Sequence, residues 1–496
     1  MSMINVSNLT FGYDGSYDNI FENVSFRIDT GWRLGFTGRN GRGKTTFLNL
    51  LLGKYEYSGS ITASVDFEYF PYEVRDMSAL TREVLDGIDG SVEDWRLMRE
   101  LARLEVGEDA LWRPFGTLSN GERTKVLLAA LFLRENSFLL IDEPTNHLDA
   151  EARTLIADYL RSKEGFILVS HDRAFLDGCI DHILSINRAD IEIQSGNFSS
   201  WYRNRQLQDN YELEQDARLK KDIRRLRETA REKAEWSDRA ERRKIGIDPK
   251  KVDNKKGYMP KQAAKAKKTM RRVGAIEGRI ERELAEKERL LKNIEKAETL
   301  KLHPLEFHSR RLVEFSGAML AYGTKTVCKD VSFTIEQGDR VALCGRNGCG
   351  KSSVIKRIIG EGGIDCEGDI FVAKGLRISY VGQDASELSG SLEEYERSCG
   401  VDPSLFRTIL RKLDFARVQF EKDIGDYSAG QKKKVLLARS LCEKAHLYIW
   451  DEPLNYIDVL SRMQIESLIK EYNPTLLFVE HDRAFCDAIA TKRVQL

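Results

Sequence analysis

The sequence lacks several features that assign chains to common protein classes. No stretch approaches the roughly 18 consecutive apolar residues of a membrane helix, and the first residues, MSMINVSNLTFGYDG, show no basic segment followed by an apolar one. The eight cysteines are scattered without a CxxC pair, which argues against a disulfide framework and a zinc site. Formal net charge is zero, because 78 Lys+Arg balance 78 Asp+Glu. We therefore expect a soluble, cytoplasmic protein with reduced cysteines.

One module occurs twice along the 496 residues. The segment GRNGRGKTT (38–46) is matched by GRNGCGKSS (345–353), and three further segments follow in the same order. The offset between partners is about 307 to 310 residues each time. The further pairs begin at Leu118 and Tyr427, at Phe138 and Leu447, and at Ser170 and Glu480. Four ordered motifs that recur in register indicate a duplicated domain.

Each half alternates short apolar runs with longer helical stretches. The runs FLLID, GFILVS, LYIWD and TLLFVE are typical of buried parallel strands joined by crossover helices. We therefore predict an α/β fold in both halves, with domains at residues 1–202 and 309–496 and a linker at residues 203–308.

The linker has a helical composition, since it is charged, rich in Arg, Lys, Glu, Ala and Leu, and nearly free of β-branched runs. Gly246, Pro249, Gly257 and Pro260 interrupt it. This pattern predicts a hairpin of two helices of about 40 residues, each about 60 Å long, with its tip at residues 245–260.

The repeated GxxxxGK[ST] segment has the chemistry of a phosphate-binding loop. Its glycines let backbone N–H groups approach phosphate oxygens, the lysine reaches the β and γ phosphates, and the hydroxyl holds Mg²⁺. The predicted loop residues are Gly38, Asn40, Gly41, Gly43, Lys44, Thr45 and Thr46, and Gly345, Asn347, Gly348, Gly350, Lys351, Ser352 and Ser353. Both loops predict binding of ATP.

Two acidic pairs end apolar strands downstream of these loops. Asp142 and Asp451 are expected to support the Mg²⁺ shell, together with Thr45 and Ser352. The next carboxylates, Glu143 and Glu452, are placed to polarise the attacking water, because phosphoryl transfer requires mainly positioning and charge stabilisation. We predict that Glu143 and Glu452 are the catalytic bases.

The segments LSNGE (118–122) and YSAGQ (427–431) complete a resemblance to the ATP-binding cassette superfamily, which covers about four fifths of the chain. The resemblance implies two cassettes that close head to tail on two ATP molecules. Site one then consists of Lys44, Glu143 and His171 with Ser428 and Gly430, and site two of Lys351, Glu452 and His481 with Ser119 and Gly121. It also implies that His171 and His481 hold the γ-phosphate and that Tyr13 and Tyr322 stack on adenine.

The two sites differ at several positions. Gln383 in YVGQD matches the glutamine that touches Mg²⁺ in the superfamily, whereas the equivalent place in YFPYE is Tyr72. The second cassette has YSAGQ for LSNGE, and Tyr456 where the first has His147. These differences predict unequal hydrolysis at the two sites, without indicating which is faster.

The linker carries the chain's strongest charge asymmetry. Residues 239–272 contain 14 Lys/Arg against 3 Asp/Glu, so the remainder of this neutral chain carries about 11 negative charges. A basic projection on an acidic body favours nucleic-acid phosphates over a merely solvated face, without base specificity. Apolar residues interleave with the lysines, either to meet a base or to pack the turn. The candidate tip residues are Lys244, Ile245, Ile247, Lys250, Lys251, Lys255, Lys256, Tyr258 and Met259.

Twin cassettes with such a linker resemble the ABC-F subfamily, whose members act on ribosomes. The resemblance implies a monomer that pairs its own cassettes and contacts 23S rRNA and P-site tRNA of the bacterial ribosome through the exit-tRNA site. Lys44 to Leu118 and Lys351 to Tyr427 span 74 and 76 residues, leaving no room for the extra arm of housekeeping members, and no basic tail follows His481. These features, with YFPY (69–72), resemble the Lsa-type antibiotic-resistance members.

That resemblance implies protection of the peptidyl-transferase centre from lincosamides, streptogramin A and pleuromutilins. ATP binding closes the cassettes on the ribosome, and hydrolysis permits release. Two alternatives stay open: a housekeeping translation factor, and the ATPase of a drug exporter that recruits a separate membrane protein. The drug spectrum, and steric against rRNA-relayed displacement, also stay open.

Overall fold

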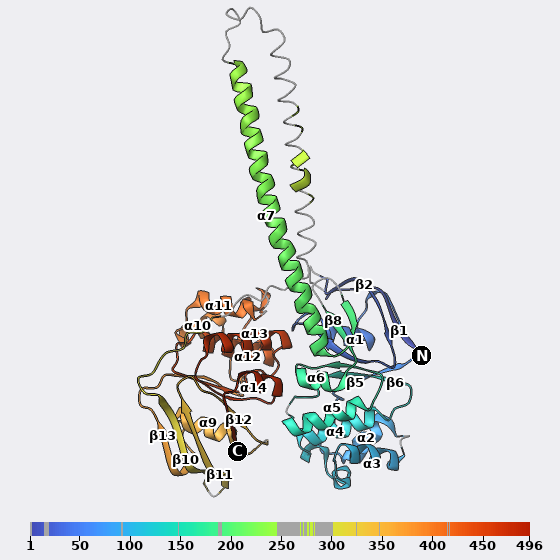
Figure 1. Cartoon of the computed structure of the whole chain (residues 1–496). Coiled ribbons are helices and arrows are strands. Elements are labelled where there is room, and N and C mark those ends of the chain that lie inside the picture. The colour runs from blue at the N-terminus through green and yellow to red at the C-terminus, as the bar shows by residue number, and fades with distance from the viewer. Residues whose placement is uncertain are drawn as a thin grey trace, which may run out of the picture. The chain divides into compact units, whose positions relative to one another are not determined.

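The computed structural model describes residues 2–13, 19–90, 93–146, 148–186, 191–245, 268, 271, 275–276, 278–280, 282, 301–323, 325–346, 348–413, 415 and 417–496. The chain divides into two compact units. One contains Met1–Trp201 and Ala297–Leu496, and the other contains Tyr202–Lys296. Both repeats thus belong to the first unit, and the segment between them forms the second (Figure 1).

The first cassette is built on a six-stranded sheet. Its strand order is β5-β6-β7-β3-β8-β9, and only the β8–β9 pair is antiparallel. The strands are β3 (Arg33–Thr37), β5 (Asp66–Phe70), β6 (Ser137–Asp142), β7 (Phe166–Val169), β8 (His182–Ile186) and β9 (Ile191–Ser195). The apolar runs of β6 and β7 are buried on both faces of the sheet, as helix-covered parallel strands require.

The second cassette repeats this plan with a five-stranded parallel sheet. Its order is β14-β15-β16-β12-β17. The strands are β12 (Arg340–Cys344), β14 (Ile378–Val381), β15 (Leu447–Asp451), β16 (Leu476–Val479) and β17 (Lys492–Gln495). Strands β6 and β15, which end at Asp142 and Asp451, each lie between an edge strand (β5 or β14) and the central strands of their sheet. The two aspartates and the glutamates that follow them therefore emerge at the carboxyl edge.

Each cassette also has a three-stranded antiparallel sheet that packs on its α/β core. The orders are β2-β1-β4 and β11-β10-β13. The strands are β1 (Met3–Phe11), β2 (Phe21–Asp29), β4 (Ser58–Thr62), β10 (Arg311–Tyr322), β11 (Lys325–Glu336) and β13 (Asp365–Val372). Phe47 and Phe36 join the first of these sheets to the parallel strands, and Val354 and Ile355 do the same in the second cassette.

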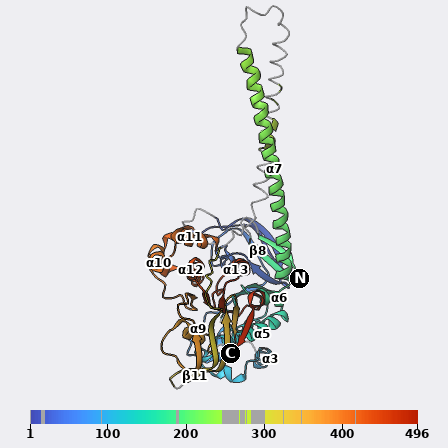
Figure 2. The ribbon, with the colours of Figure 1, turned by 60° about the vertical axis from the view of Figure 1, so that its left-hand side comes forward.

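Helices flank both sheets, and the signature segments 118–122 and 427–431 lead into two of them, α4 and α12. In the first they are α1 (Lys44–Leu51), α2 (Thr81–Asp89), α3 (Asp94–Arg103), η1 (Glu108–Trp112), η2 (Phe115–Thr117), α4 (Asn120–Leu131), α5 (Ala150–Arg161) and α6 (Arg173–Cys179). In the second they are α9 (Lys351–Ile359), α10 (Leu392–Cys399), α11 (Pro403–Lys412), η4 (Arg417–Glu421), η5 (Ile424–Asp426), α12 (Ala429–Cys442), α13 (Val459–Tyr472) and α14 (Arg483–Ile489). Figures 1 and 2 show α10 and α11 at the end of the second cassette opposite α9 and β11.

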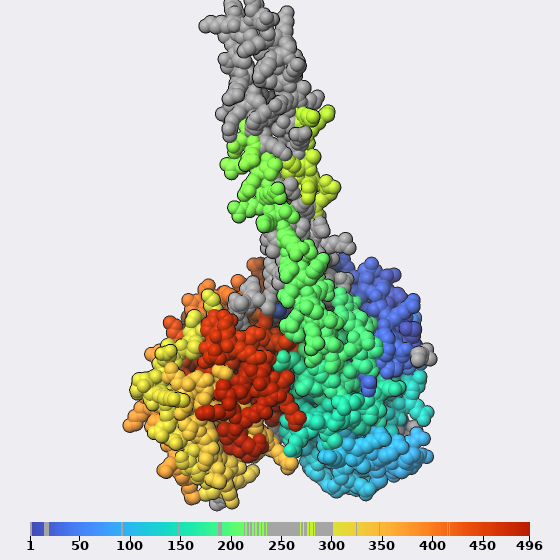
Figure 3. All heavy atoms as spheres, viewed as in Figure 1, coloured from blue at the N-terminus to red at the C-terminus, as the bar shows by residue number. Residues whose placement is uncertain are grey.

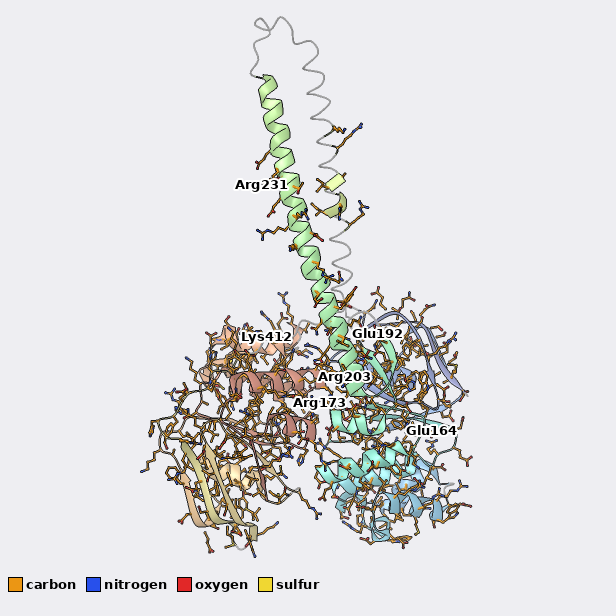
Figure 4. The ribbon with its side chains drawn as sticks, viewed as in Figure 1. Glu164, Arg173, Glu192, Arg203, Arg231 and Lys412 are labelled. Atoms are coloured by element: carbon orange, nitrogen blue, oxygen red, sulfur yellow. The ribbon has the colours of Figure 1, made fainter. Side chains whose placement is uncertain are left out.

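The linker begins as one long helix, α7 (Phe198–Ile245), of 48 residues. Ion pairs four residues apart, Arg224–Glu228 and Arg231–Glu235, support its exposed surface; Arg231 is labelled in Figure 4. Residues 268, 271, 275–276, 278–280 and 282 are also helical. Apart from Ile245, the predicted tip at residues 245–260 lies outside the described residues.

The predicted α/β fold with two cassettes is confirmed. Among the described residues, no helix combines the length and apolar content that a membrane span requires. Figure 3 shows the last segment of the chain, in red, beside the yellow β10–β13 region on the surface of the second cassette. Leu302 is buried in the core of that cassette, and the N–H of Leu305 donates to Ala445 O at 2.8 Å.

Candidate ATP sites

Both phosphate loops wrap around the start of a helix. Gly41 and Gly43 have φ of 82° and 94°, and their counterparts Gly348 and Gly350 have 82° and 103°, a backbone region that favours glycine. Gly350 also leaves no room for a side chain, since an added Cβ would lie 3.0 Å from Val327 Cγ1. The glycines therefore bring loop N–H groups to the N-termini of α1 and α9, where anions bind.

The loop lysines lie over these helix starts. Lys44 Nζ donates to Gly38 O at 2.7 Å and to Asn40 Oδ1 at 3.3 Å, and Lys351 Nζ donates to Gly345 O at 2.8 Å. Burial lowers the pKa of Lys44, while the carboxylates of Asp458, Glu143 and Asp142 oppose that change. Each ammonium is thus positioned at the mouth of its loop. Asn347 lies outside the described residues.

Hydroxyl and carboxylate oxygens converge beside each lysine. Thr45 Oγ1 donates to Asp142 Oδ2 at 3.2 Å, and Ser352 hydrogen-bonds Asp451 in the second cassette. Burial raises the pKa of Asp142 and of Asp451. Asp451 is buried and Asp142 is partly buried. A carboxylate paired with a hydroxyl at each site forms a hard-oxygen donor set, so these residues fit Mg²⁺.

The next carboxylates differ in their surroundings. Burial, and then the charge of Asp142, raise the pKa of Glu143 to about 8, and its Oε1 is buried without a hydrogen-bond partner in the described structure. Burial also acts to raise the pKa of Glu452, yet hydrogen bonds from His481, Asn455 and Gln383 bring it below its usual value. Both glutamates have positive φ, 52° and 48°, which turns them away from the strand ahead of them. The surroundings therefore favour the carboxylate form of Glu452 and the protonated form of Glu143.

A histidine faces each glutamate. His171 Nε2 lies 3.3 Å from Glu143 Oε1, and His481 Nε2 lies 3.4 Å from Glu452 Oε1. Burial and the charge of Lys44 lower the pKa of His171 well below its usual value, so this imidazole is neutral. The predicted histidine and glutamate of each site are thus neighbours. Gln383 is also at site two, where its Nε2 donates to Glu452 Oε2 at 3.1 Å.

The signature serines cap the helices that follow them. Ser119 Oγ accepts from the N–H of Glu122 at the start of α4, and Ser428 Oγ accepts from the N–H of Gln431 at the start of α12. The Glu122 and Gln431 side chains accept from the serine N–H groups in return, which completes two capping boxes. The free N–H groups of both helix starts remain oriented toward an anion.

Each signature lies in one cavity with the phosphate loop of the other cassette. A cavity of about 680 Å³ is lined by Ser119 and Gly121 together with Lys351, Glu452 and His481. A second cavity, of about 560 Å³, is lined by Lys44 and Thr45 together with Ser428 and Gly430. Glu143 and His171 are not among the residues that line the second cavity. The structure thus brings together both halves of the head-to-tail arrangement.

Direct contacts join the cassettes around these cavities. Asn40 Nδ2 donates to Tyr456 O at 2.8 Å, and Arg346 forms an exposed ion pair with Glu151 at 3.1 Å. Arg173, labelled in Figure 4 on α6, pairs with Glu466 of α13 at 2.7 Å.

Two aromatic residues contact the phosphate loops. Tyr13 Oη lies 2.8 Å from Thr46 Oγ1, and Tyr322 Oη lies 3.4 Å from Ser353 Oγ. The Tyr13 ring lines the site-one cavity, and both rings are partly exposed. Each ring is therefore accessible to a planar base beside its loop.

The remaining sequence predictions lie outside these contacts. Tyr72 is partly buried and His147 lies outside the described residues. Lys244 and Ile245 end α7, and the other tip residues, Ile247, Lys250, Lys251, Lys255, Lys256, Tyr258 and Met259, lie outside the described residues.

Several residues at the sites were not predicted from sequence. Tyr69 Oη donates to Asp142 Oδ2 at 3.0 Å, and Asn455 Nδ2 donates to Glu452 Oε2 at 2.7 Å. Lys434, buried on α12, lies 3.7 Å from Asp458, whose charge also acts on Lys44 across the cassettes. Asn455 was predictable from the sequence, since it lies three residues after Glu452. The contact of Tyr69 with Asp142 was not, because it depends on the register between β5 and β6.

Comparison with known proteins places these motifs in one family. The family model described as "ABC transporter" matches residues 21–146 and 328–455, which together exceed half of the chain. The ribosome protection protein VmlR of Bacillus subtilis is 27% identical over 493 residues, covering 97% of this chain and 85% of its own. The energy-dependent translational throttle protein EttA of Escherichia coli is 27% identical over 528 residues, covering 95% and 88%.

Solved structures agree on the fold. The archaeal ribosome recycling factor aABCE1, in a complex with stalk protein aP1, has a TM-score of 0.62 and 19% identity, over 98% of this chain and 87% of its own. Together with the two phosphate loops and signatures, the family match shows that the chain is an ATPase. The chain belongs to the ATP-binding cassette family, and its relatives along nearly the whole length are members of the ABC-F subfamily.

Proposed function

We propose that this chain is a cytoplasmic ABC-F ATPase that protects the bacterial ribosome from antibiotics. In its ATP-closed form the protein binds the ribosome as a monomer. The linker (203–308), which joins the cassettes 1–202 and 309–496 in the sequence, enters the exit-tRNA site. The tip contacts 23S rRNA and P-site tRNA near the peptidyl-transferase centre, where lincosamides, streptogramin A and pleuromutilins bind. The observation that carries the proposal is the pair of composite cavities, because ATP completes each cavity only when both cassettes meet.

The residues then have distinct tasks. Lys44 and Lys351 bind the β and γ phosphates, and N–H groups after Ser119 and Ser428 bind the γ-phosphate from the opposite cassette. Glu452, as an anion held by three donors, orients the attacking water and accepts its proton. When bound by Thr45 with Asp142 and by Ser352 with Asp451 and Gln383, Mg²⁺ supplies neutralisation of phosphate charge.

Ribosome binding is supported by charge and by similarity. Residues 239–272 carry 14 basic against 3 acidic residues, and such a segment binds RNA phosphates without base specificity. The similarity to VmlR, named as a ribosome protection protein, extends over 97% of this chain and therefore spans the linker.

A cell-free bacterial translation assay tests the proposal. The purified protein is titrated into reactions stopped by a lincosamide, a pleuromutilin, a streptogramin A or a macrolide, and we expect recovery with the first three. Replacing residues 250–258 with a short Gly/Ser turn should abolish recovery and leave ATPase activity intact. Recovery that persists in this variant would contradict a mechanism centred on the tip.

The similarity to EttA, which is also 27% identical, favours one second candidate, a factor that acts on translation without drug. It predicts no recovery in any drug-stopped reaction, and a change in drug-free translation upon addition of the protein and ATP. The same titration, with drug omitted, distinguishes the two functions.

A further inference from the structure

Lys433 is a buried lysine in the second cassette whose surroundings connect the two ATP sites. It lies one turn into α12, the helix that Ser428 of site one caps, and only 3% of its surface is exposed. A lysine is almost never buried to this extent unless its ammonium has partners.

The partners of Lys433 belong to site two. Its Nζ donates to Gly382 O at 2.8 Å and to Glu452 O at 3.2 Å. Gly382 precedes Gln383, whose amide donates to the Glu452 carboxylate at 3.1 Å. One ammonium therefore ties together the helix, the Gln383 loop and the main chain of the catalytic glutamate.

Two opposing effects act on the pKa of this ammonium. Burial lowers the pKa of Lys433, but the carboxylates of Glu480, Asp451, Glu452 and Asp384 all act against that change. Hydrogen bonds from a charged donor are shorter and stronger than neutral ones, so the connection is more rigid than a hydroxyl or amide would make it.

The first cassette lacks this connection. The residue five positions after its signature serine is Thr124, and Tyr72 stands where the second cassette has Gln383. A threonine hydroxyl lies one bond from Cβ, whereas a lysine ammonium lies four bonds from Cβ, so Thr124 cannot bridge two main-chain segments as Lys433 does.

We propose that Lys433 is a positioning residue of site two, which holds Glu452 and the Gln383 loop in register with the signature helix of site one. The proposal rests on the role proposed above for Glu452 and is independent of the ribosome. Hydrolysis at site two then depends on Lys433, and hydrolysis at site one does not.

Steady-state ATPase kinetics of Lys433→Thr, which copies the first cassette, test this dependence. In a Glu143→Gln background, where turnover comes from site two, we expect kcat to fall about tenfold and KM to stay within about twofold, because misplacement of reacting groups affects the rate more than binding. In a Glu452→Gln background, the same substitution should change turnover by less than about twofold. Lys433→Arg, which keeps a charged donor, should restore most of the rate.

Lys432→Thr is the matched control, since it removes a partly exposed lysine from the same helix. An equal loss from Lys432→Thr, an equal loss in both backgrounds, or no loss from Lys433→Thr would overturn the proposal. If Glu143→Gln alone abolishes ATP hydrolysis, the kcat of Lys433→Thr is compared with those of Lys433→Arg and Lys432→Thr in the otherwise unmodified chain. The proposal then requires that only Lys433→Thr lowers kcat. If Lys433→Thr fails to fold, Lys433→Gln replaces it. A Glu452→Gln enzyme with full turnover would instead refute the role of Glu452.

Discussion

At the residue scale, Glu143 and Glu452, the proposed catalytic bases, are equivalent in sequence and different in environment. Glu452 accepts hydrogen bonds from Gln383 and Asn455, whereas Glu143 lies beside Asp142 and its buried Oε1 accepts no hydrogen bond. A histidine faces each of the two glutamates. A general base must be ionised at the working pH, and the surroundings of Glu452 favour the carboxylate while those of Glu143 favour the acid. Site two is therefore the better equipped for hydrolysis.

This difference predicts unequal effects of the two glutamine substitutions. Glu452→Gln should lower total ATP turnover at least about tenfold, and Glu143→Gln only about two- to threefold, because the raised pKa of Glu143 makes it the weaker base at neutral pH. Phosphate release by each purified variant at pH 7.5 measures both losses. Equal losses would show that the asymmetry in hydrogen bonding has no kinetic consequence.

Site residues were predictable from the sequence where a short motif alone specifies their role. Lys44 and Ser428 lie in motifs whose spacing alone implies a loop or a helix start, and the structure places them at one cavity. The hydroxyl of Tyr69 reaches Asp142 only because Tyr69 pairs with Leu140 across β5 and β6, and single-sequence patterns do not specify such a register. Sequence alignment matches Tyr72 with Gln383, but the tyrosine that contacts the Asp142 carboxylate is Tyr69.

At the element scale, a buried carboxylate joins two helices of the first cassette. In the first cassette α3 is joined to α5 through Glu100, which is 1% exposed. Tyr159 Oη donates to its Oε2 at 2.9 Å, and Lys163, just beyond α5, pairs with the same oxygen. The parallel strands of this cassette could be predicted from apolar runs, but this helix pairing could not, because it joins residues about 60 positions apart.

The Glu100 pair predicts a pH-dependent stability. Burial acts to raise the pKa of Glu100, yet the hydrogen bond and charge of Lys163 and the Tyr159 hydroxyl lower it overall. A lowered folded-state pKa means that the carboxylate stabilises the fold above its unfolded pKa, about 4.3, and that this stability is lost as pH falls through the folded pKa. Glu100→Gln should therefore lower the free energy of unfolding by about 2 kcal/mol at pH 7 and by much less near pH 3.5.

Urea unfolding followed by circular dichroism at both pH values measures this change. Glu164→Gln, which alters an exposed glutamate labelled in Figure 4, is the control and should leave the midpoint unchanged. A Glu100→Gln effect of the same size at both pH values would exclude the charge as its origin.

At the scale of the whole molecule, ATP needs only to favour the closed pair of cassettes. If hydrolysis permits release, a chain that binds ATP without cleaving it should stay on the ribosome. We expect the Glu143→Gln, Glu452→Gln double variant to co-sediment with ribosomes in ATP and to remain in the supernatant in ADP. Sedimentation that is the same with either nucleotide would contradict ATP-dependent closure of the cassettes on the ribosome.

The contact between the cassettes is itself asymmetric. Arg173, in the segment HDRAF (171–175) that recurs at 481–485, pairs with Glu466 at 2.7 Å. These two side chains are only 13% and 14% exposed. The equivalent arginine, Arg483, lines a cavity of about 190 Å³ together with Ala157, the residue aligned with Glu466. One edge of the cassette pair thus has a largely buried ion pair, and the aligned position at the other edge has an alanine.

A charge exchange tests whether this ion pair stabilises the closed state. Arg173→Glu places two carboxylates together, and since breaking a buried pair costs about 3 kcal/mol, we expect the apparent Kd for ATP to rise at least about tenfold. Adding Glu466→Arg should restore most of the affinity, because the ion pair re-forms with reversed polarity. Arg483→Glu is the control, and its effect should be less than about twofold; failure of the double exchange to recover ATP binding would show that Arg173 acts other than through Glu466.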